Sequence, residues 1–209
     1  GFDDFMAGTN AQIYFGRANM GSGFNAAASN LGTPVDLGTV GRYASAGDIN
    51  GDGYQDMLVS SSNGADNYIV YGSSSASSWT APASWVSGAG SNGAPRLTKI
   101  VSETGISLNG TYSSMGDING DGFDDILISA FGTNASDPND FNAKNNGGLY
   151  VVFGQSGHWN NGDLSLADLS TNKLGFRITG AVDFDRAGEY SWTGVGDMNG
   201  DGLDDFIFQ

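Results

Sequence analysis

Short apolar runs recur along the chain, each bounded by glycine, asparagine or serine. Four of them lie directly after acidic residues: "DFMAG" at 4–8, "DMLVSS" at 56–61, "DILISAF" at 125–131 and "DFIF" at 205–208. Runs of this length that are rich in Ile, Val, Phe and Tyr are typical of β-strands. Because the apolar residues are consecutive rather than alternating, we expect strands that are buried on both faces.

A second set of runs ends in an aromatic residue followed by glycine. These are "QIYFG" at 12–16, "YIVYG" at 68–72 and "LYVVFG" at 149–154, and weaker strand candidates occur at 96–102 and 174–180. No segment shows helical periodicity over more than a turn or two. The pattern predicts an all-β fold in which each repeat holds about four strands, the content of one propeller blade.

The runs belong to a longer repeat. "GDINGDGYQD" begins at residue 47, "GDINGDGFDD" at 116 and "GDMNGDGLDD" at 196, and "GFDD" at residue 1 matches the end of the same stretch. Repeats of this size indicate propellers or arrays. We therefore expect one partial β-propeller over residues 1–209, with four-stranded antiparallel blades at approximately 1–52, 53–121 and 122–201 and the start of another at 202–209.

Each acidic stretch places oxygen-bearing side chains around a glycine turn. Counted from its first aspartate, positions 1, 3, 5 and 9 are Asp or Asn, position 6 is Gly, and position 7 can offer only a backbone carbonyl. This spacing matches the first nine positions of a calcium loop, and oxygen ligands without His or Cys favour Ca²⁺ over zinc or copper. The predicted ligands are Asp48, Asn50, Asp52, Tyr54 and Asp56 in loop 1 (residues 48–56); Asp117, Asn119, Asp121, Phe123 and Asp125 in loop 2 (residues 117–125); and Asp197, Asn199, Asp201, Leu203 and Asp205 in loop 3 (residues 197–205). Asp4 ends a truncated fourth copy.

The acidic stretch has two alternatives to this calcium loop. An EF-hand needs an acidic residue at position 12, but that position holds Val59, Ile128 and Phe208, so the EF-hand is rejected. A Gly/Asn/Asp hairpin turn without a metal is the other alternative. Three intact copies with identical spacing favour the metal.

The charge of the chain limits its partners. The net charge is −15, and 13 of the 23 acidic residues lie in the four copies of the motif. Nucleic acid and anionic membrane are disfavoured because both require a basic face. No apolar run approaches the roughly 18 residues of a membrane span, and the chain has no cysteine.

The predicted calcium affinity bears on localisation. Extracellular calcium modules bind with dissociation constants of roughly 10⁻⁴–10⁻³ M. Such sites stay empty at resting cytosolic calcium, so we expect a secreted or cell-surface location.

These stretches resemble a known family. "GDINGDGFDDILISA" followed by "GGLYVVFG" is similar to the FG-GAP repeats of the integrin α-subunit β-propeller and its bacterial surface and secreted relatives. "GFRITGAVDFDRAGEY" at 175–190 resembles the segment before the next calcium loop. The resemblance implies four-stranded blades, calcium loops that join two strands of one blade, structural metals, and extracellular recognition or adhesion.

The chain also departs from the family pattern. Family propellers usually have seven blades, whereas this chain has about three repeats and begins within a motif. We expect an excerpt of a longer polypeptide, so that the partners include further blades of that polypeptide. The alternative is a piece that self-associates, because an open wedge of blades exposes sheet faces and edges.

A protein or glycan ligand is expected but is not identified by the sequence. As a lectin, the chain could stack sugar rings on Trp79, Trp85, Trp159 or Trp192. Trp79 and Trp85 lie in a long variable loop and are the better candidates. Trp192 aligns with Tyr43 and Tyr112 and is expected in the core.

An enzyme is the least favoured function. Catalysis usually recruits His or a carboxylate with a tuned pKa. His158 is the only His, and the expectation for it is an exposed loop residue. Glu103, Glu189 and Asp183 show no paired spacing, so no catalytic residue is assigned. Membership of a polysaccharide-active enzyme stays a minor alternative.

Overall fold

The computed structural model describes a defined part of the chain. The described residues are 5–7, 12–14, 35–36, 40–61, 66–72, 97–103, 106, 108, 111–130, 147–157, 159, 163–182 and 185–209. The chain divides into two compact units, a smaller one of residues 1–40 with 73–87 and a larger one of residues 41–72 with 88–209.

The smaller unit contains a short sheet. Strands β1 (Phe5–Ala7), β2 (Gln12–Tyr14) and β3 (Val35–Asp36) are hydrogen-bonded in chain order. The β1–β2 and β2–β3 pairs are antiparallel. The predicted strands at 4–8 and 12–16 are thus present as β1 and β2.

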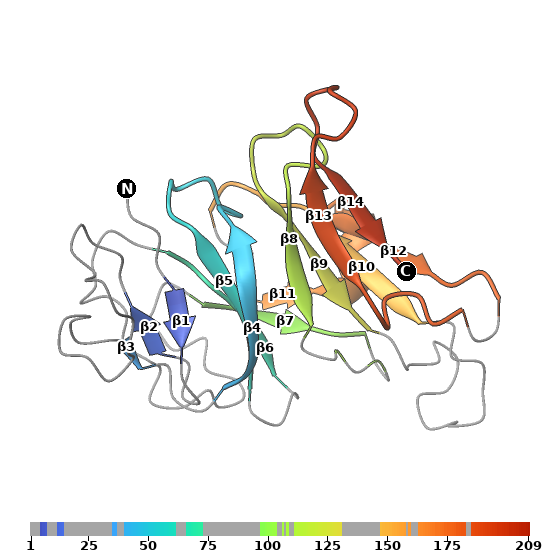
Figure 1. The fold of residues 1–209 in the computed structure, drawn as a ribbon. Helices are drawn as coiled ribbons and strands as arrows, with labels where there is room; N and C mark the ends of the chain where they lie inside the picture. The colour runs from blue at the N-terminus through green and yellow to red at the C-terminus, as the bar shows by residue number, and fades with distance from the viewer. Residues whose placement is uncertain are drawn as a thin grey trace. The chain divides into compact units, whose positions relative to one another are not determined.

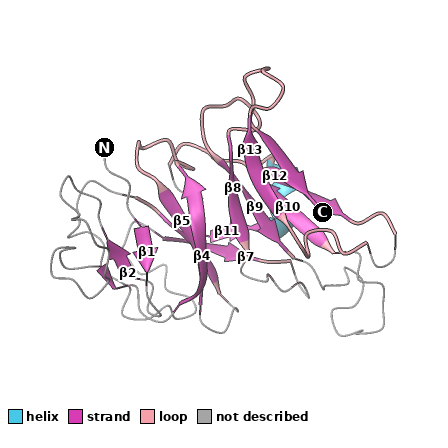
Figure 2. Ribbon diagram, in the orientation of Figure 1, coloured by secondary structure: helices cyan, strands magenta, loops and turns pink. Residues whose placement is uncertain are grey.

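The larger unit contains three sheets among its described residues (Figures 1 and 2). The first has the order β11-β7-β6-β5-β4 and consists of β4 (Val40–Gly47), β5 (Asp56–Ser61), β6 (Asn67–Val70), β7 (Leu97–Val101) and β11 (Asp163–Ser165). The second has the order β12-β10-β9-β8 and consists of β8 (Tyr112–Gly116), β9 (Asp125–Ser129), β10 (Gly148–Val152) and β12 (Gly175–Thr179). The third pairs β13 (Trp192–Gly196) with β14 (Asp205–Phe208).

The predicted all-β fold is confirmed. The apolar runs form β5, β9 and β14, the aromatic-Gly runs form β6 and β10, and the weaker candidates form β7 and β12. Every residue of β6, β9 and β10 is buried, as the consecutive apolar residues predicted. The same expectation is wrong for β14, in which no residue is buried. The described helical segments are short, η4 (Leu166–Asp168) and α1 (Leu169–Asn172).

The strand that precedes each acidic loop was not predicted. These strands, β4, β8 and β13, are rich in Ser, Ala and Gly, which carry little strand signal. Packing explains the small residues, because β13 lies against β8. A Cβ added to Gly194 would lie 2.7 Å from the Cα of Met115.

The first sheet has a fifth strand where four were expected. Strand β11 follows the second sheet's β10 in the chain but pairs with β7, and it pairs in parallel. Leu164 in β11 is fully buried, and Leu166 and Leu169 just after it are buried in the same hydrophobic cluster. Burial of these leucines fixes the segment on the edge of the first sheet.

The central strands of the second sheet, β9 and β10, are buried on both faces because their side chains alternate between two clusters. Ile126 and Ile128 of β9 enter the first core, a cluster that also includes Leu58 and Ile69 of the first sheet. Leu127 between them enters the second core, which is made of Met115, Leu127, Leu149 and Val151, with Trp192 and Phe206 of the third sheet packed against it. The second sheet therefore has one core on each side.

Candidate metal loops

Each predicted calcium loop connects two neighbouring strands of one sheet. Loop 1 follows β4 and leads into β5, loop 2 joins β8 to β9, and loop 3 joins β13 to β14. The loops lie at the same end of the three strands that precede them (Figure 1). This is the connection that the family resemblance implied.

The backbone of loop 1 folds around its own side-chain oxygens. Asp48 accepts hydrogen bonds from the N–H groups of Asp52 at 3.0 Å and Gly53 at 2.8 Å. Asn50 Oδ1 accepts from Asp52 N–H at 3.0 Å, and Asp52 Oδ1 accepts from Tyr54 N–H at 2.9 Å. Positions 1, 3 and 5 thus surround a single turn.

The same turn recurs in the other two loops. In loop 2, Asp117 Oδ2 accepts from Gly122 N–H at 2.8 Å, and Asp121 Oδ1 accepts from Phe123 N–H at 3.0 Å. In loop 3, the matching distances are 2.9 Å for Gly202 N–H to Asp197 Oδ2 and 2.9 Å for Leu203 N–H to Asp201 Oδ1. Identical residue spacing therefore produces identical local geometry three times.

Glycine is required at three places in or next to each loop, and not only at position 6, where a sharp turn is expected from the sequence. The residue before position 1, position 4 and position 6 all have φ between 70° and 91°. This left-handed region favours glycine because other residues carry a Cβ that clashes there. The signal was present in the sequence, since these residues are glycine in every intact copy: Gly47, Gly51 and Gly53; Gly116, Gly120 and Gly122; Gly196, Gly200 and Gly202.

The aspartate at position 9 points into the protein. Asp56 Oδ2 accepts from Ile49 N–H at 3.0 Å, and its Oδ1 accepts from Gly72 N–H at 2.7 Å. Asp125 repeats this arrangement with Ile118 at 3.0 Å and Gly154 at 2.9 Å. Position 9 therefore connects the loop to the strand that ends in the aromatic-Gly pair.

Burial alters the acidity of both inner carboxyls. Asp56 is 1% exposed and Asp125 is 0% exposed. Burial raises the pKa of each to about 7, although the two backbone N–H donors act in the opposite direction. In loop 3, the corresponding Asp205 is only half-buried and accepts from Met198 N–H at 2.9 Å.

The aromatic-Gly pair needs its glycine for the same hydrogen bond to position 9. A Cβ on Gly72 would lie 2.5 Å from the carbonyl oxygen of Gln55, and one on Gly154 would lie 2.5 Å from that of Asp124. Neither distance can be accommodated without movement of the backbone. The glycine lets the strand end approach the loop closely enough to donate to position 9.

The donor set of the loops fits a hard cation. All side-chain donors are carboxylate or amide oxygens, and the described ion pairs, Lys99–Asp66, Arg177–Glu103 and Arg186–Glu189, involve no loop carboxylate. Across the described ranges, however, three acidic or histidine side chains do not gather into a ready-made cluster. Position 9 faces backbone N–H groups, so a bound ion would also depend on the Asn oxygen and the position 7 carbonyl.

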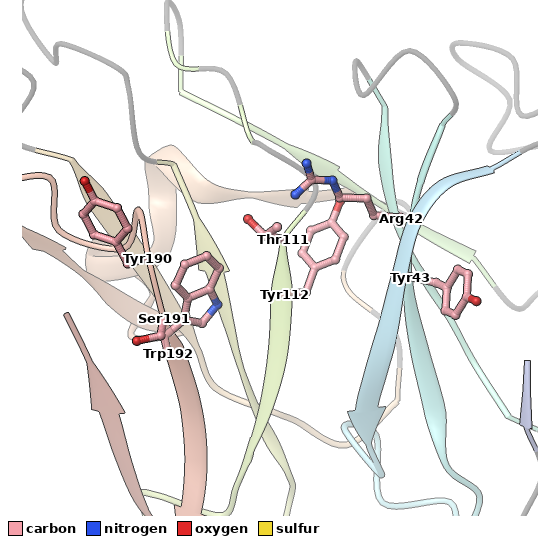
Figure 3. A pocket seen from close by; sticks show the side chains of 7 residues that line it. All are labelled: Arg42, Tyr43, Thr111, Tyr112, Tyr190, Ser191 and Trp192. Carbon is pink, nitrogen blue, oxygen red and sulfur yellow. The ribbon is translucent and has the colours of Figure 1, made fainter.

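A pocket lies near the opposite ends of the same three strands. Its volume is about 560 Å³, and Figure 3 shows the residues that line it: Arg42, Tyr43, Thr111, Tyr112, Tyr190, Ser191 and Trp192. Tyr112 is buried and its hydroxyl donates to Asn67, whereas Tyr190 is 63% exposed. In Figure 3, Tyr43 lies on the other side of the β4 ribbon from these rings.

The structure revises the tryptophan candidates. Trp159 is 4% exposed within the first core, so its proposed stacking on a sugar ring is wrong. Trp192 packs against the second core, as expected, but remains partly exposed. Trp79 and Trp85 lie outside the described residues.

Two of the remaining carboxylates form ion pairs. Glu103 pairs with Arg177 at 3.3 Å, and Glu189 pairs with Arg186 at 3.2 Å. His158, Asp183 and Asp4 lie outside the described residues.

Comparison with known proteins identifies one repeat. The family model for the FG-GAP repeat matches residues 41–72, which include β4 after its first residue, loop 1, β5 and β6. Comparison with curated proteins found no match. The described part of the chain contains no helix that is long and apolar enough to cross a membrane. The predicted resemblance is confirmed for residues 41–72, which match the FG-GAP repeat.

Proposed function

We propose that the chain is a calcium-stabilised adhesion or structural module of a larger cell-surface or secreted protein, without catalytic activity of its own. The observation that carries the proposal is the threefold arrangement of oxygen donors, in which positions 1, 3 and 5 surround one turn and position 9 lies at its base. One turn of this kind is common in proteins. Three turns with the same ligand spacing favour a common role, in which each turn binds one ion.

Electrostatics supports a cation in loops 1 and 2. In loop 1, Asp48, Asp52 and Asp56 bring negative charge together. The pKa of Asp56 is raised mainly by burial and further by the charges of Asp52 and Asp48. A divalent cation at the turn would attract these carboxylates and offset the cost of ionising Asp56. Asp125 is in the same situation relative to Asp117 and Asp121.

The stabilisation by calcium is expected to be large relative to the stability of a domain. At free calcium about tenfold above the dissociation constant, each site adds roughly 1.4 kcal/mol. Three sites would add about 4 kcal/mol, a substantial part of a typical free energy of unfolding. Sites with dissociation constants of roughly 10⁻⁴–10⁻³ M fill in extracellular calcium but not in the cytosol. This difference is the reason for proposing a secreted or surface location.

Calorimetric titration with calcium tests the proposal. The wild-type protein is expected to bind about three ions, and Asp121→Asn is expected to reduce this number by one because it removes a ligand charge from loop 2. Asp168→Asn is the matched control, since Asp168 is exposed and lies outside the loops. Absence of calcium binding up to roughly 10 mM would overturn the proposal.

A carbohydrate-binding role is the second candidate, and the pocket favours it. Arg42 and Trp192 offer a hydrogen-bond donor and an aromatic face at its wall (Figure 3). Sugars are commonly held by such combinations of stacking and polar contacts. A glycan array with wild-type protein and Arg42→Ala is the test. Glycan binding that Arg42→Ala abolishes would establish this role, and absence of binding would reject it.

A further inference from the structure

Consecutive loops are joined by a repeated contact. Asp124, at position 8 of loop 2, accepts a 2.6 Å hydrogen bond from the N–H of Asp48 in loop 1. The N–H of Asp124 in turn donates to the carbonyl oxygen of Asp48 at 3.2 Å. Asp204, at position 8 of loop 3, forms the same pair with Asp117 of loop 2, at 2.9 and 3.0 Å. In both cases, position 8 of one loop binds the two main-chain groups of position 1 in the loop before it.

The side chain at position 7 packs on the same turn. A Cβ on Gly51 would lie 2.5 Å from Cε1 of Phe123, and a Cβ on Gly120 would lie 2.9 Å from Cδ2 of Leu203. Gly51 and Gly120 are position 4 of loops 1 and 2, whereas the two side chains belong to loops 2 and 3. An apolar residue and an aspartate from the next loop therefore contact the same turn together.

The residue held by this contact is the one around which the turn is built. The two carboxylate oxygens of Asp48 accept from the N–H groups of Asp52 and Gly53, so they face the interior of loop 1. The main chain of Asp48 is held instead by Asp124, which leads into β9 of the second sheet. Because the backbone orients its side chain, a group from the second sheet fixes the position of the first predicted ligand in loop 1.

We propose that Asp124 and Asp204 are positioning residues for the metal loop of the preceding sheet, so that calcium binding in loops 1 and 2 is coupled to packing against the next sheet. Neither aspartate is one of the predicted ligands, which occupy positions 1, 3, 5, 7 and 9. Each acts through the main chain of position 1. This inference rests on the proposed calcium binding and adds that each of the two loops depends on a residue outside its own sheet.

Coupling of this kind is reciprocal. Groups that orient a metal ligand without touching the ion commonly change metal affinity by about 10–100-fold when they are removed. If Asp124 raises the calcium affinity of loop 1 by such a factor, the contact between Asp124 and Asp48 is strengthened by the same factor when loop 1 holds its ion. Calcium in loop 1 thus holds the second sheet against the first, in addition to stabilising the loop itself.

Terbium luminescence can report the occupancy of loop 1 separately from the other loops. Tb³⁺ is a hard cation that takes oxygen ligands as Ca²⁺ does, and a tyrosine close to the ion sensitises its emission. Position 7 is Tyr54 in loop 1, whereas it is Phe123 in loop 2 and Leu203 in loop 3. Emission excited through tyrosine therefore follows loop 1, and the variant Tyr54→Phe gives the background to be subtracted.

Three variants test the role of position 8. Asp124→Ala is expected to weaken terbium binding in loop 1 by about 10–100-fold, although Asp124 lies in loop 2. Asp124→Asn keeps an oxygen that can accept from the N–H of Asp48, so it should retain most of the affinity despite the loss of charge. Asp204→Ala is the matched control, because it removes the same contact from loop 2 and should leave terbium binding in loop 1 nearly unchanged. Displacement of terbium by calcium gives the corresponding calcium affinities.

The outcomes separate this inference from the proposed function. Asp124→Ala keeps the 3.0 Å hydrogen bond from Gln155 N–H to the Ile49 carbonyl, which joins the same two sheets, and each titration is made below the melting temperature of the calcium-free variant. Equal affinity of loop 1 in the wild type and Asp124→Ala would overturn the inference alone. So would an equal loss in Asp204→Ala, or a loss in Asp124→Asn as large as in Asp124→Ala. A wild-type protein that binds neither terbium nor calcium would overturn both.

Discussion

The backbone N–H of Gly72 donates a 2.7 Å hydrogen bond to Oδ1 of Asp56, and this bond connects the end of the β6 segment to the start of β5. Asp56 is also the ninth residue of loop 1 and accepts from Ile49 within that loop. One carboxylate therefore fixes the loop, the strand after it and the aromatic-Gly pair together. The same arrangement around Asp125 and Gly154 explains why the acidic stretch and the aromatic-Gly pair recur together in the sequence.

The first prediction concerns the glycine of the aromatic-Gly pair. Gly154→Ala is expected to destabilise the protein by about 1–3 kcal/mol, because the added Cβ meets backbone atoms of loops 1 and 2. Urea denaturation measures the effect. Ser156→Ala, at an exposed position nearby, should leave the free energy of unfolding almost unchanged. Equal stability of Gly154→Ala and the wild type would contradict the role given to this glycine.

The second prediction concerns the carboxylate at position 9. Asp125→Asn presents an amide NH₂ to one of two buried N–H donors, from Ile118 or Gly154, and leaves that donor without an acceptor. A loss of roughly 1–3 kcal/mol is expected even with calcium removed by a chelator. With calcium present, the difference from wild type should grow, because one ligand charge is missing. A difference that is the same with and without calcium would show that position 9 has only a structural role.

The third prediction is a pH dependence in the absence of calcium. Asp56 and Asp125 have folded-state pKa values of about 7, above the ordinary 3.8, so the folded state binds more protons than the unfolded state between these values. The contribution of these two groups to the free energy of unfolding of the calcium-free protein should therefore fall as pH rises from about 4 to about 7 and then level off. The lowered pKa of the exposed Asp197 acts in the opposite direction, but only below its ordinary value.

Thermal melting at several pH values, with chelator and with calcium, checks this dependence. Calcium binds the ionised carboxylates, so the increase in melting temperature that calcium causes should grow over the same pH range. The double variant Asp56→Asn/Asp125→Asn should lose most of the pH dependence. A calcium-free wild type whose stability rises steadily from about pH 5 to about pH 7 would refute the assignment.

The fourth prediction compares two equivalent positions in neighbouring sheets. Leu127→Ala should cost about 2–5 kcal/mol, because Leu127 is fully buried in the second core. Ile207→Ala, at the matching position of β14, should cost less than about 0.5 kcal/mol in a dilute solution, because Ile207 is 60% exposed. Differential scanning calorimetry at low protein concentration measures both variants. Similar losses at the two positions would show that β14 is covered in the free chain.

Much of the fold could be predicted because its signals are local. Consecutive apolar residues predicted β5, β6, β9, β10 and β14, and these strands are present. The strands β4, β8 and β13 escaped prediction because their small residues are adapted to a neighbouring sheet rather than to strand formation. Strand β11 escaped it because its parallel pairing with β7 joins Asp163 to Lys99, residues far apart in the chain.

The sequence by itself determined the three loops, since their oxygen spacing and left-handed glycines lie within about nine residues and depend only on local backbone conformation. Tertiary structure alone decided which distant groups meet those loops: Gly72 at Asp56, and Asp124 at Asp48 across 76 residues. It also decided that Trp159 is buried and that Trp192 is only partly so. The physical reason is that a turn is specified by neighbouring residues, whereas burial and contacts between loops depend on how separate strands pack.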